Sequence, residues 1–174
     1  MRVQVQLRYP ATVEAVAAML ADPAYGHARV AASGAVAHHV DVAHGPDGAF
    51  TVTTRRSMPT AGIPANFRAF VGTSLDVRQV EVWEAGSTAP RRGTVVVEIA
   101  GAPVRLTGIT TLAPDGAAGS AASILTYDGE VKAGVPLFGA AMEEAAAHAV
   151  RSALEAEQQA GNEWLSAHPH GAQA

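Results

Sequence analysis

The stretch from Tyr127 to Leu165 decides the fold, and it reads YDGEVKAGVPLFGAAMEEAAAHAVRSALEAEQQAGNEWL. Its first part predicts a strand that ends at the turn-forming residues Gly134 and Pro136. From Leu137 onward about 28 residues contain no proline, which predicts a helix of roughly 40 Å at 1.5 Å per residue. The chain is therefore expected to end in one long helix that a strand leads into.

The predicted helix has a polar side and an apolar side, and the apolar side is mostly alanine. The apolar positions are Met142, Ala145, Ala146, Ala149, Val150, Ala153, Ala156, Ala160 and Trp164. Glu157 falls on the edge of this side. An apolar face of this length has to be covered by another element. The strands earlier in the chain are the expected cover.

Strand patterns account for most of the chain before the helix. The expected strands cover residues 3–9, 35–42, 49–55, 74–84, 93–100, 104–112 and 120–131. Two short helices are expected after the first strand, capped by Thr12 and by Asp22. Successive hairpins and segregated helices predict an α+β, helix-grip architecture. In it, a seven-stranded curved antiparallel sheet surrounds the C-terminal helix, in the order β-α-α-β6-α.

The strand expected at residues 74–84 carries an irregular pattern. Its apolar residues change phase, from Leu75 and Val77 to Val80 and Val82. Such a change predicts a β-bulge near Arg78, or a strand that is covered on both faces.

Length and composition narrow the class of protein. The chain has 174 residues, 48% hydrophobic and 16% charged, with a net charge of −4. One domain over residues 1–165 and a flexible tail over 166–174 are expected. The acidic balance argues against a nucleic-acid partner. The lack of a signal peptide and of a long apolar run predicts no transmembrane segment and a cytoplasmic protein.

Several classes of catalytic and metal site have no support in the sequence. Cysteine is absent, which excludes disulfides and thiolate chemistry. His38 and His39 are neighbours on a strand and point to opposite faces, and no zinc-binding spacing is present. We therefore expect no metal, no cofactor and no identifiable catalytic residue.

Scattered short stretches carry a resemblance to known proteins over nearly the whole chain to Leu165. They are Thr54-Arg55-Arg56 with Met58-Pro59-Thr60, Ile63-Pro64 with Phe67, Gln79-Val80-Glu81-Val82-Trp83, Gly129-Glu130-Val131-Lys132 with Val135-Pro136-Leu137, and Ala156-Glu157-Gln158-Gln159 with Gly161 and Trp164-Leu165. The element order resembles the START-like, or SRPBCC, superfamily, which includes lipid-transfer domains and polyketide cyclases. These stretches are similar to an uncharacterised actinobacterial family, DUF2505. The resemblance implies a hydrophobic cavity between sheet and helix, and no particular activity.

The expected cavity defines the candidate ligand-binding residues. They are Arg55, Met58, Phe67, Phe70, Trp83, Leu137, Met142, Ala146, Ala149, Ala153 and Glu157. Two interpretations of the alanine face stay open: close helix–sheet packing, or unfilled volume for a ligand. Trp83 is either core or cavity wall. Residues 58–72, which include an expected short helix with Phe67 and Phe70, form either a lid or a plug of the core.

The charged candidates also have two interpretations. Adjacent Arg55 and Arg56 must point to opposite faces of a strand, so one of them is expected to point inward. Glu157 either anchors a ligand or forms a salt bridge with a strand arginine such as Arg55 or Arg105.

The leading functional hypothesis is binding of a small hydrophobic ligand (a lipid, polyketide, isoprenoid or steroid-like compound) by a carrier or sensor. The first alternative is a cyclase or aromatase acting on a polyketide-like substrate, with Glu157 or Arg55 assisting. The second is a protein-interaction or chaperone-like domain. Binding is favoured because no pair of titratable groups is clearly placed together on the inner face. The sequence leaves the oligomeric state open.

Overall fold

A computed structural model of the protein describes residues 1–60, 74–86, 89–116, 121–135 and 137–169. The elements are β1 (Arg2–Tyr9), α1 (Val13–Leu20), α2 (Pro23–Ala32), β2 (Ala37–His44), a 3-10 turn (Pro46–Gly48), β3 (Phe50–Pro59), β4 (Ser74–Trp83), β5 (Arg91–Ile99), β6 (Val104–Pro114), β7 (Ser123–Ala133) and α4 (Gly139–Ala167). This is the predicted order of a strand, two short helices, six strands and a long helix. The expected helix around Phe67 and Phe70 lies outside the described residues.

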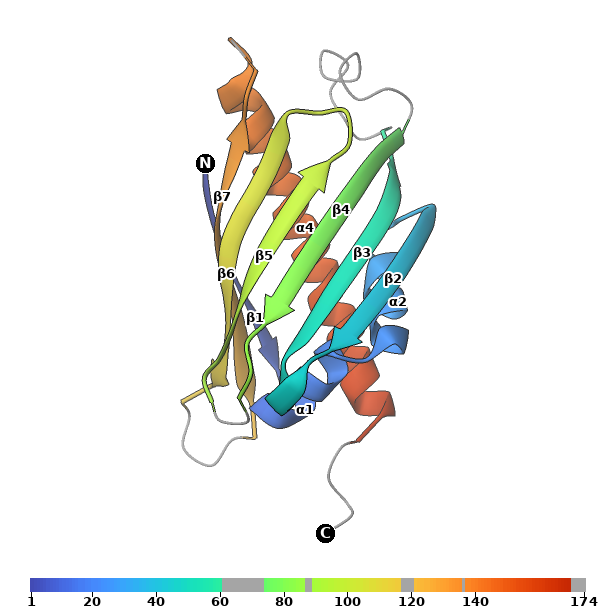
Figure 1. Ribbon diagram of the computed structural model, residues 1–174, viewed down its shortest axis with the longest axis vertical. Helices are drawn as coiled ribbons and strands as arrows, with labels where there is room; N and C mark the ends of the chain where they lie inside the picture. The colour runs from blue at the N-terminus through green and yellow to red at the C-terminus, as the bar shows by residue number, and fades with distance from the viewer. Residues whose placement is uncertain (61–73, 87–88, 117–120, 136, 170–174) are drawn as a thin grey trace.

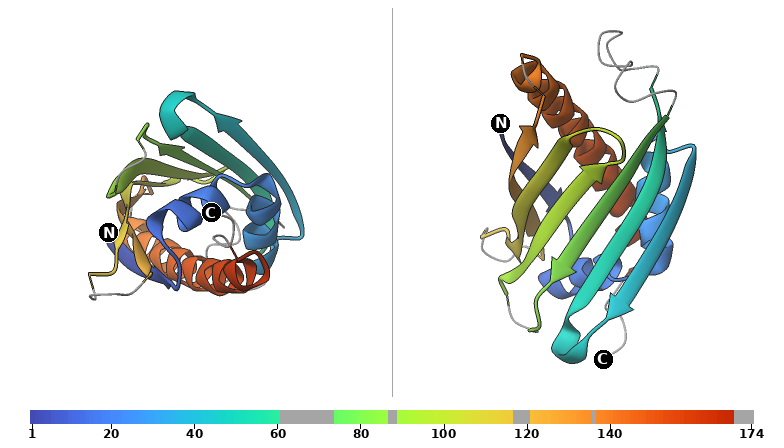
Figure 2. Two further views of the ribbon diagram at one scale, coloured as in Figure 1. Left: turned by 90° about the horizontal axis from the view of Figure 1, so that it is seen from below. Right: turned by 45° about the horizontal axis from the view of Figure 1, so that its top comes forward.

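The strands form one antiparallel sheet that curves around the long helix. Its strand order is β1-β7-β6-β5-β4-β3-β2. β1 pairs with β7, so the first and last strands of the chain are neighbours. The sheet wraps over one side of α4, while α1 and α2 lie at one end of the space between them (Figures 1 and 2). The predicted helix-grip fold is confirmed.

The two short helices begin at the predicted caps. The side chain of Thr12 accepts a hydrogen bond from the backbone N–H of Ala15 at 3.3 Å. The side chain of Asp22 accepts one from the N–H of Ala24 at 2.8 Å. Each cap satisfies a backbone donor that the first helical turn leaves free.

The long helix differs from its prediction at both ends. It begins at Gly139 instead of Leu137, because Leu137 has a φ of 67°, outside the helical region, and its side chain is 99% exposed. It continues to Ala167, two residues into the segment expected to be a flexible tail. Burial of Leu165 and an edge-on contact between Trp164 and Tyr25 hold this last part of the helix against the domain.

The expected bulge in β4 does not exist. β4 keeps one uninterrupted register with β3, from Ser74 opposite Pro59 to Trp83 opposite Phe50. The phase change arises because Gln79 and Glu81 occupy buried, inward positions. The outward position of Val82 is 45% exposed. The inner face of β4 therefore combines apolar side chains with the buried polar side chains of Gln79 and Glu81.

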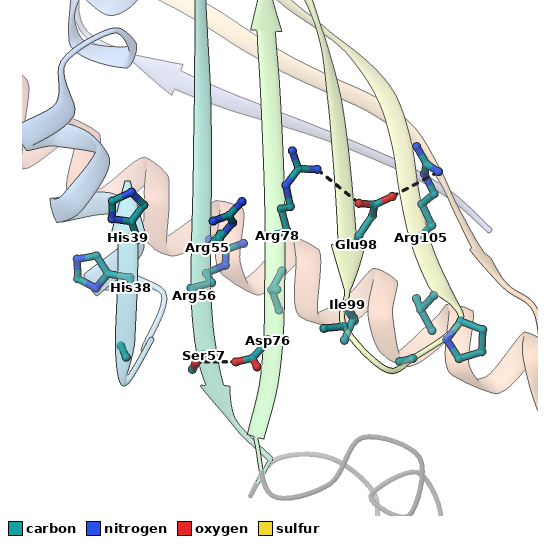
Figure 3. Close-up of a pocket in the computed structure, with 16 residues that line it drawn as sticks. His38, His39, Arg55, Arg56, Ser57, Asp76, Arg78, Glu98, Ile99 and Arg105 are labelled. Atoms are coloured by element: carbon teal, nitrogen blue, oxygen red, sulfur yellow. Dashed lines mark hydrogen bonds and ion pairs between the residues drawn. The ribbon is translucent and has the colours of Figure 1, made fainter. Parts of the chain in front are cut away.

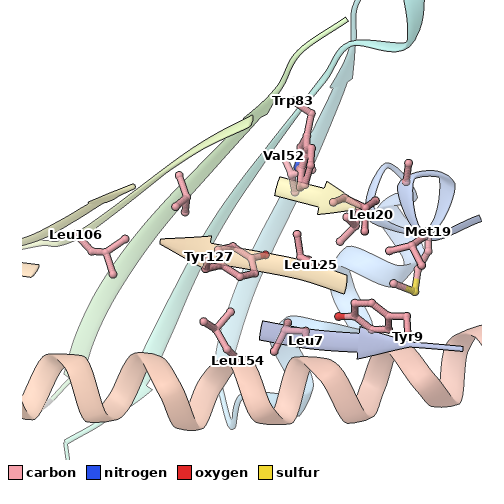
Figure 4. Packing of buried hydrophobic residues seen from close by; sticks show 14 of the residues in the cluster. Leu7, Tyr9, Met19, Leu20, Val52, Trp83, Leu106, Leu125, Tyr127 and Leu154 are labelled. Carbon is pink, nitrogen blue, oxygen red and sulfur yellow. The ribbon is translucent and has the colours of Figure 1, made fainter. Parts of the chain in front are cut away.

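The hydrophobic core lies where α1, α2 and α4 meet the inner face of the sheet. Leu7 of β1, Met19 and Leu20 of α1, Leu125 of β7 and Leu154 of α4 are all part of it (Figure 4). The fully covered positions of α4 are Met142, Ala147, Leu154, Glu157, Gly161 and Leu165. The most buried side of the helix is thus rotated away from the predicted alanine stripe. No helix of the described residues has the length and apolarity that crossing a membrane requires.

We expect Gly161→Ala to destabilise the protein by about 1–3 kcal/mol, despite the higher helix propensity of alanine. A Cβ at this position would lie 2.6 Å from the buried ring of Tyr9 and 3.1 Å from the hydroxyl of Tyr25. Urea denaturation of the variant measures the effect. Ser152→Ala, at an exposed position of the same helix, is the control and should change little. An unchanged or higher midpoint for Gly161→Ala would contradict this close packing.

Candidate functional site

A cavity of about 310 Å³ lies between the inner face of the sheet and α4. Its described walls are mostly apolar and come from β3 to β7 and from the alanine side of the helix. The lining residues are Ser33, Arg56, Met58, Pro59, Leu75, Val77, Val97, Ile99, Val104, Leu106, Val131, Ala146, Ala149, Val150 and Ala153. Short alanine side chains on the helix leave this volume unfilled. Concave, mostly apolar walls of this kind are typical of small-molecule sites.

A smaller hollow of about 40 Å³ adjoins the main cavity. The two share Arg56, Val97, Leu106, Val150 and Ala153 as lining residues. Polar groups of Gln79, Tyr127 and Glu157 enter the lining only in the smaller hollow. We call this part the inner end of the cavity. One space therefore has an apolar body and a polar inner end.

A buried network centred on Glu81 lies next to the inner end, whose described lining includes neither Glu81 nor Arg29. Nη1 of Arg29 lies 2.9 Å from Oε1 of Glu81, and the two side chains are 2% and 1% exposed. The side-chain amide of Gln79 donates to the same carboxylate at 2.7 Å. The hydroxyl of Tyr127 donates to its other oxygen at 3.4 Å. Glu81 is thus held by groups from α2, β4 and β7.

A second carboxylate, Glu157 of α4, is held more loosely. Its oxygens lie 3.7 Å from Nη1 of Arg29 and 3.6 Å from Nη1 of Arg56. These separations are those of ion pairs, longer than a good hydrogen bond. Arg56 also donates to the side-chain oxygen of Gln79 at 3.0 Å, which joins the two carboxylates into one cluster. We call Arg29, Arg56, Gln79, Glu81 and Glu157 the buried charged cluster.

Burial controls the ionisation of this cluster. Removal from water raises the pKa of Glu157, and the neighbouring Arg29 and Arg56 offset only part of the rise. Burial by itself would lower the pKa of Arg29, but the charges of Glu81 and Glu157 outweigh it and raise that pKa well above its usual value. The pKa of Tyr127 is also raised well above its usual value, first by burial and then by Glu81. Tyr127 therefore serves as a neutral hydrogen-bond donor.

The structure brings together five of the predicted site residues. Met58, Ala146, Ala149 and Ala153 line the main cavity. Glu157 lies at the inner end. It pairs with Arg29 and Arg56, and not with the predicted partners Arg55 or Arg105.

The other predicted site residues lie elsewhere. Arg55 is exposed on the outer face of β3, and Arg56 is the inward member of the pair. Trp83 stacks on Phe50 with ring centroids 5.7 Å apart, inside the hydrophobic core. Met142 is also a core residue, and Leu137 is exposed to solvent. Phe67 and Phe70 lie outside the described residues.

The sequence did not predict three members of the buried charged cluster, namely Arg29, Gln79 and Glu81. The interpretation that no titratable groups share the inner face is wrong, because Glu81 and Glu157 share it with Arg29 and Arg56. A signal was present: Gln79 and Glu81 follow Leu75 and Val77 at every second residue, which places all four on one face. For Arg29, in the last turn of a short helix, no comparable signal exists.

The outer face of the sheet carries a larger and more open groove, of about 810 Å³. Arg78, Glu98 and Arg105 lie side by side across β4, β5 and β6 there (Figure 3). Glu98 pairs with Arg78 at 3.5 Å and with Arg105 at 3.4 Å, and all three side chains are at least two-fifths exposed. Solvent competes with such surface pairs. The interior cavity is less open to solvent than this groove, and it is therefore the candidate site.

Sequence comparison agrees with the arrangement of sheet, helix and cavity. Residues 4–165 match a family described as "Protein of unknown function (DUF2505)". The chain belongs to the DUF2505 family. No curated protein sequence matches it.

Solved structures share the fold over almost the full length of this family member. The Zhui aromatase/cyclase of Streptomyces sp. R1128 superposes with a TM-score of 0.61 and 14% identity, over 100% of this chain and 98% of that chain. A START superfamily protein from Mycobacterium smegmatis gives 0.56 and 13%, over 94% and 98%. Norcoclaurine synthase from Thalictrum flavum gives 0.60 and 11%, over 98% and 89%. These likenesses show a START-like, SRPBCC-type fold.

The raised pKa of Glu157 predicts a pH dependence of stability that Glu157→Gln removes. The folded protein retains the Glu157 proton above the ordinary pKa of 4.5, so stability from the protonated form is lost as the pH rises through that region. The free energy of unfolding of the wild type, relative to Glu157→Gln, should therefore fall as the pH rises from about 4 to about 7. Urea denaturation at several pH values measures this difference.

Asp128 provides a control of opposite sign. A hydrogen bond from Arg2 lowers the pKa of Asp128, so stability from its ionised form is lost as the pH falls. The stability of the wild type relative to Asp128→Asn should then fall only in acid, below about pH 4. A Glu157 difference that stays flat or rises above pH 4.5 would contradict the raised pKa.

Proposed function

We propose that this protein binds a small hydrophobic molecule in the cavity between the sheet and α4, as a carrier or sensor. The observation that carries the proposal is a cavity of about 310 Å³ whose described walls are mostly apolar and whose inner end carries polar groups. If the cavity were only a packing defect, there would be no physical reason for a buried charged cluster at one end of it. Burial of an apolar ligand there releases water from both surfaces, which drives binding.

The volume of the cavity limits the size of the ligand. Small-molecule pockets span roughly 300–1,000 Å³, so this one lies at the lower end of the range. A compound with one or two rings, or a chain of medium length, fits this volume better than a steroid does. The smaller hollow adds about 40 Å³, which suits a polar head group.

Proteins with the same fold give independent support. Norcoclaurine synthase was solved in complex with dopamine and hydroxybenzaldehyde, which are both single-ring compounds. The aromatase/cyclase of Streptomyces sp. R1128 shares the same arrangement of sheet and helix. Fold alone does not assign a function, so the contents of this cavity carry the argument.

Filling the cavity should abolish binding without unfolding the protein. Ala153→Leu projects a larger side chain into both the main cavity and the inner end. We expect at least about tenfold weaker binding of the fluorescent apolar probe N-phenyl-1-naphthylamine, with stability unchanged or higher because the cavity is filled. Fluorescence titration measures the affinity, and urea denaturation measures the stability.

Ser152→Leu is the matched control. It adds the same side chain to the adjacent, exposed position of α4 and should leave probe binding unchanged. Native mass spectrometry of protein purified from its host should also show a bound lipophile that Ala153→Leu lacks. Equal probe affinity in the wild type and Ala153→Leu would refute the proposal.

A cyclase-type enzyme acting on a polyketide-like substrate is a second candidate, which Glu157 favours. Its pKa is raised by burial, and it lines the cavity beside Arg56 and Tyr127, so it has the placement of a general acid. An enzyme of this type would convert a synthetic poly-β-ketone chain to a cyclised product detectable by mass spectrometry. Glu157→Gln should then abolish product formation while probe affinity stays within about threefold of the wild type, because the amide keeps the shape of the carboxyl group. Product formation that survives Glu157→Gln would exclude this role.

A further inference from the structure

The inner end of the cavity is charged but electrically balanced. Arg29 and Arg56 supply two positive charges, and Glu81 and Glu157 supply two negative charges. Arg29, Glu81 and Glu157 are each at most 3% exposed, and the side chain of Arg56 is 9% exposed. Tyr127, which also lines the inner end, stays neutral. No charge is left over, within the described residues, for an ionic head group to neutralise.

The balanced cluster nevertheless leaves hydrogen-bonding capacity unused. Glu157 faces Nη1 of Arg29 and of Arg56 at 3.7 and 3.6 Å, distances at which a direct hydrogen bond is not made. Nη2 of Arg29 is also buried with no hydrogen-bond partner among the described residues, but Arg29 is not among the described lining residues, so Arg56 and Glu157 are the charged groups that a ligand head meets. Buried polar groups in this condition lose the stabilisation that a well-placed partner would supply.

We propose that the inner end selects ligands with a neutral polar head, such as an alcohol, a phenol or an amide, and discriminates against carboxylates and ammonium groups. This inference rests on the proposed ligand-binding function and specifies the chemical class of its ligand.

A hydroxyl group can bridge Arg56 and Glu157 from the side that faces the hollow. Its oxygen, placed beside the pair and about 2.8 Å from both, accepts a hydrogen bond from Nη1 of Arg56 and donates its own proton to the carboxylate of Glu157. The 3.6 Å separation of those two groups allows such a bridge from the side, but it leaves no room for an oxygen directly between them. The adjoining hollow of about 40 Å³ holds a group of this size, comparable to a water molecule.

An ionic head meets a different balance of forces. A carboxylate attracted by Arg56 is repelled by Glu157, and it leaves the cluster with an unpaired negative charge. An ammonium group attracted by Glu157 is repelled by Arg56 and leaves an unpaired positive charge. An uncompensated charge in a buried site costs far more than a neutral group that completes its hydrogen bonds.

The charge balance also predicts how selectivity changes on mutation. Glu157→Gln removes one negative charge and leaves the cluster with a net positive charge, which favours a carboxylate head. Arg56→Gln removes one positive charge and favours an ammonium head. Glu157→Gln keeps a hydrogen-bonding group of the same size, and Arg56→Gln keeps a hydrogen-bond donor on a shorter side chain, so their effects on a neutral head are expected to be smaller than those on a charged head.

The test compares 1-decanol, decanoate and decylammonium, which share one chain length and differ in head group. Each displaces N-phenyl-1-naphthylamine from the full-length protein at about pH 8, where the last two are charged. We expect the affinity ratio of decanoate to 1-decanol to rise about tenfold or more from the wild type to Glu157→Gln. Arg56→Gln should raise the ratio of decylammonium to 1-decanol by a similar factor. Ratios between variants cancel the different hydrophobicities of the three probes.

Glu98→Gln is the charge-matched control. It removes one carboxylate from the outer face of the sheet, where Glu98 pairs with Arg78 and Arg105, and it should leave both ratios unchanged. Circular dichroism verifies that each variant is folded. If Glu157→Gln fails to fold, Arg56→Gln tests the charge balance of the cluster by removing a positive charge instead of a negative one.

The outcomes separate this inference from the function on which it rests. If all three probes bind and the ratios do not change in the folded variants, the head-group inference is overturned and ligand binding stands. If no probe binds the wild type and the naphthylamine reporter does not bind either, both fail. A higher ratio of decanoate to 1-decanol in Glu157→Gln, together with a higher ratio of decylammonium to 1-decanol in Arg56→Gln, supports the inference.

Discussion

The ion pair between Arg29 and Glu81 is the interaction on which the interior of this protein depends. Both side chains are almost completely removed from water, where a lone charge would cost several kcal/mol. Each can be buried only because the other lies 2.9 Å away. The pair joins α2 to β4, and the longer contact of Arg29 with Glu157 extends the connection to α4. Three elements far apart in the sequence are therefore positioned by one guanidinium group.

The cavity follows from the way α4 divides its contacts. Its leucine and glycine positions pack closely, with Leu154 in the core and Gly161 against Tyr9 and Tyr25. Its alanine positions, Ala146, Ala149 and Ala153, face the curved sheet at a distance that their methyl groups do not fill. A curved sheet and a straight helix cannot stay equally close along their whole length. Side-chain size along the helix decides where the space is filled and where it remains.

A charged cluster beside an apolar cavity gives the interior two kinds of surface. The apolar walls favour a hydrophobic ligand of almost any shape that fits, and they contribute little specificity. The cluster supplies directional groups in a medium of low dielectric constant, where unpaired polar atoms are costly. In the proposed binding function, affinity and selectivity are thereby assigned to different residues of the same site. The fold is shared with enzymes and with a START superfamily protein, so the function has to be argued from residues such as Arg56 and Glu157 and not from the architecture.

The sequence by itself determined the order of elements, the fold class and the helix caps, because these depend on local patterns. Alternation of polar and apolar residues marks strands, and Thr12 and Asp22 mark helix starts, within a few residues of chain. It also indicated that Glu157 lies near the interior. Only the tertiary structure decided which member of the Arg55–Arg56 pair points inward, since strand register sets that parity. The same holds for the pairing of Glu157 with Arg29, 128 positions away, because electrostatic attraction depends on distance in space and leaves no periodic trace in the sequence.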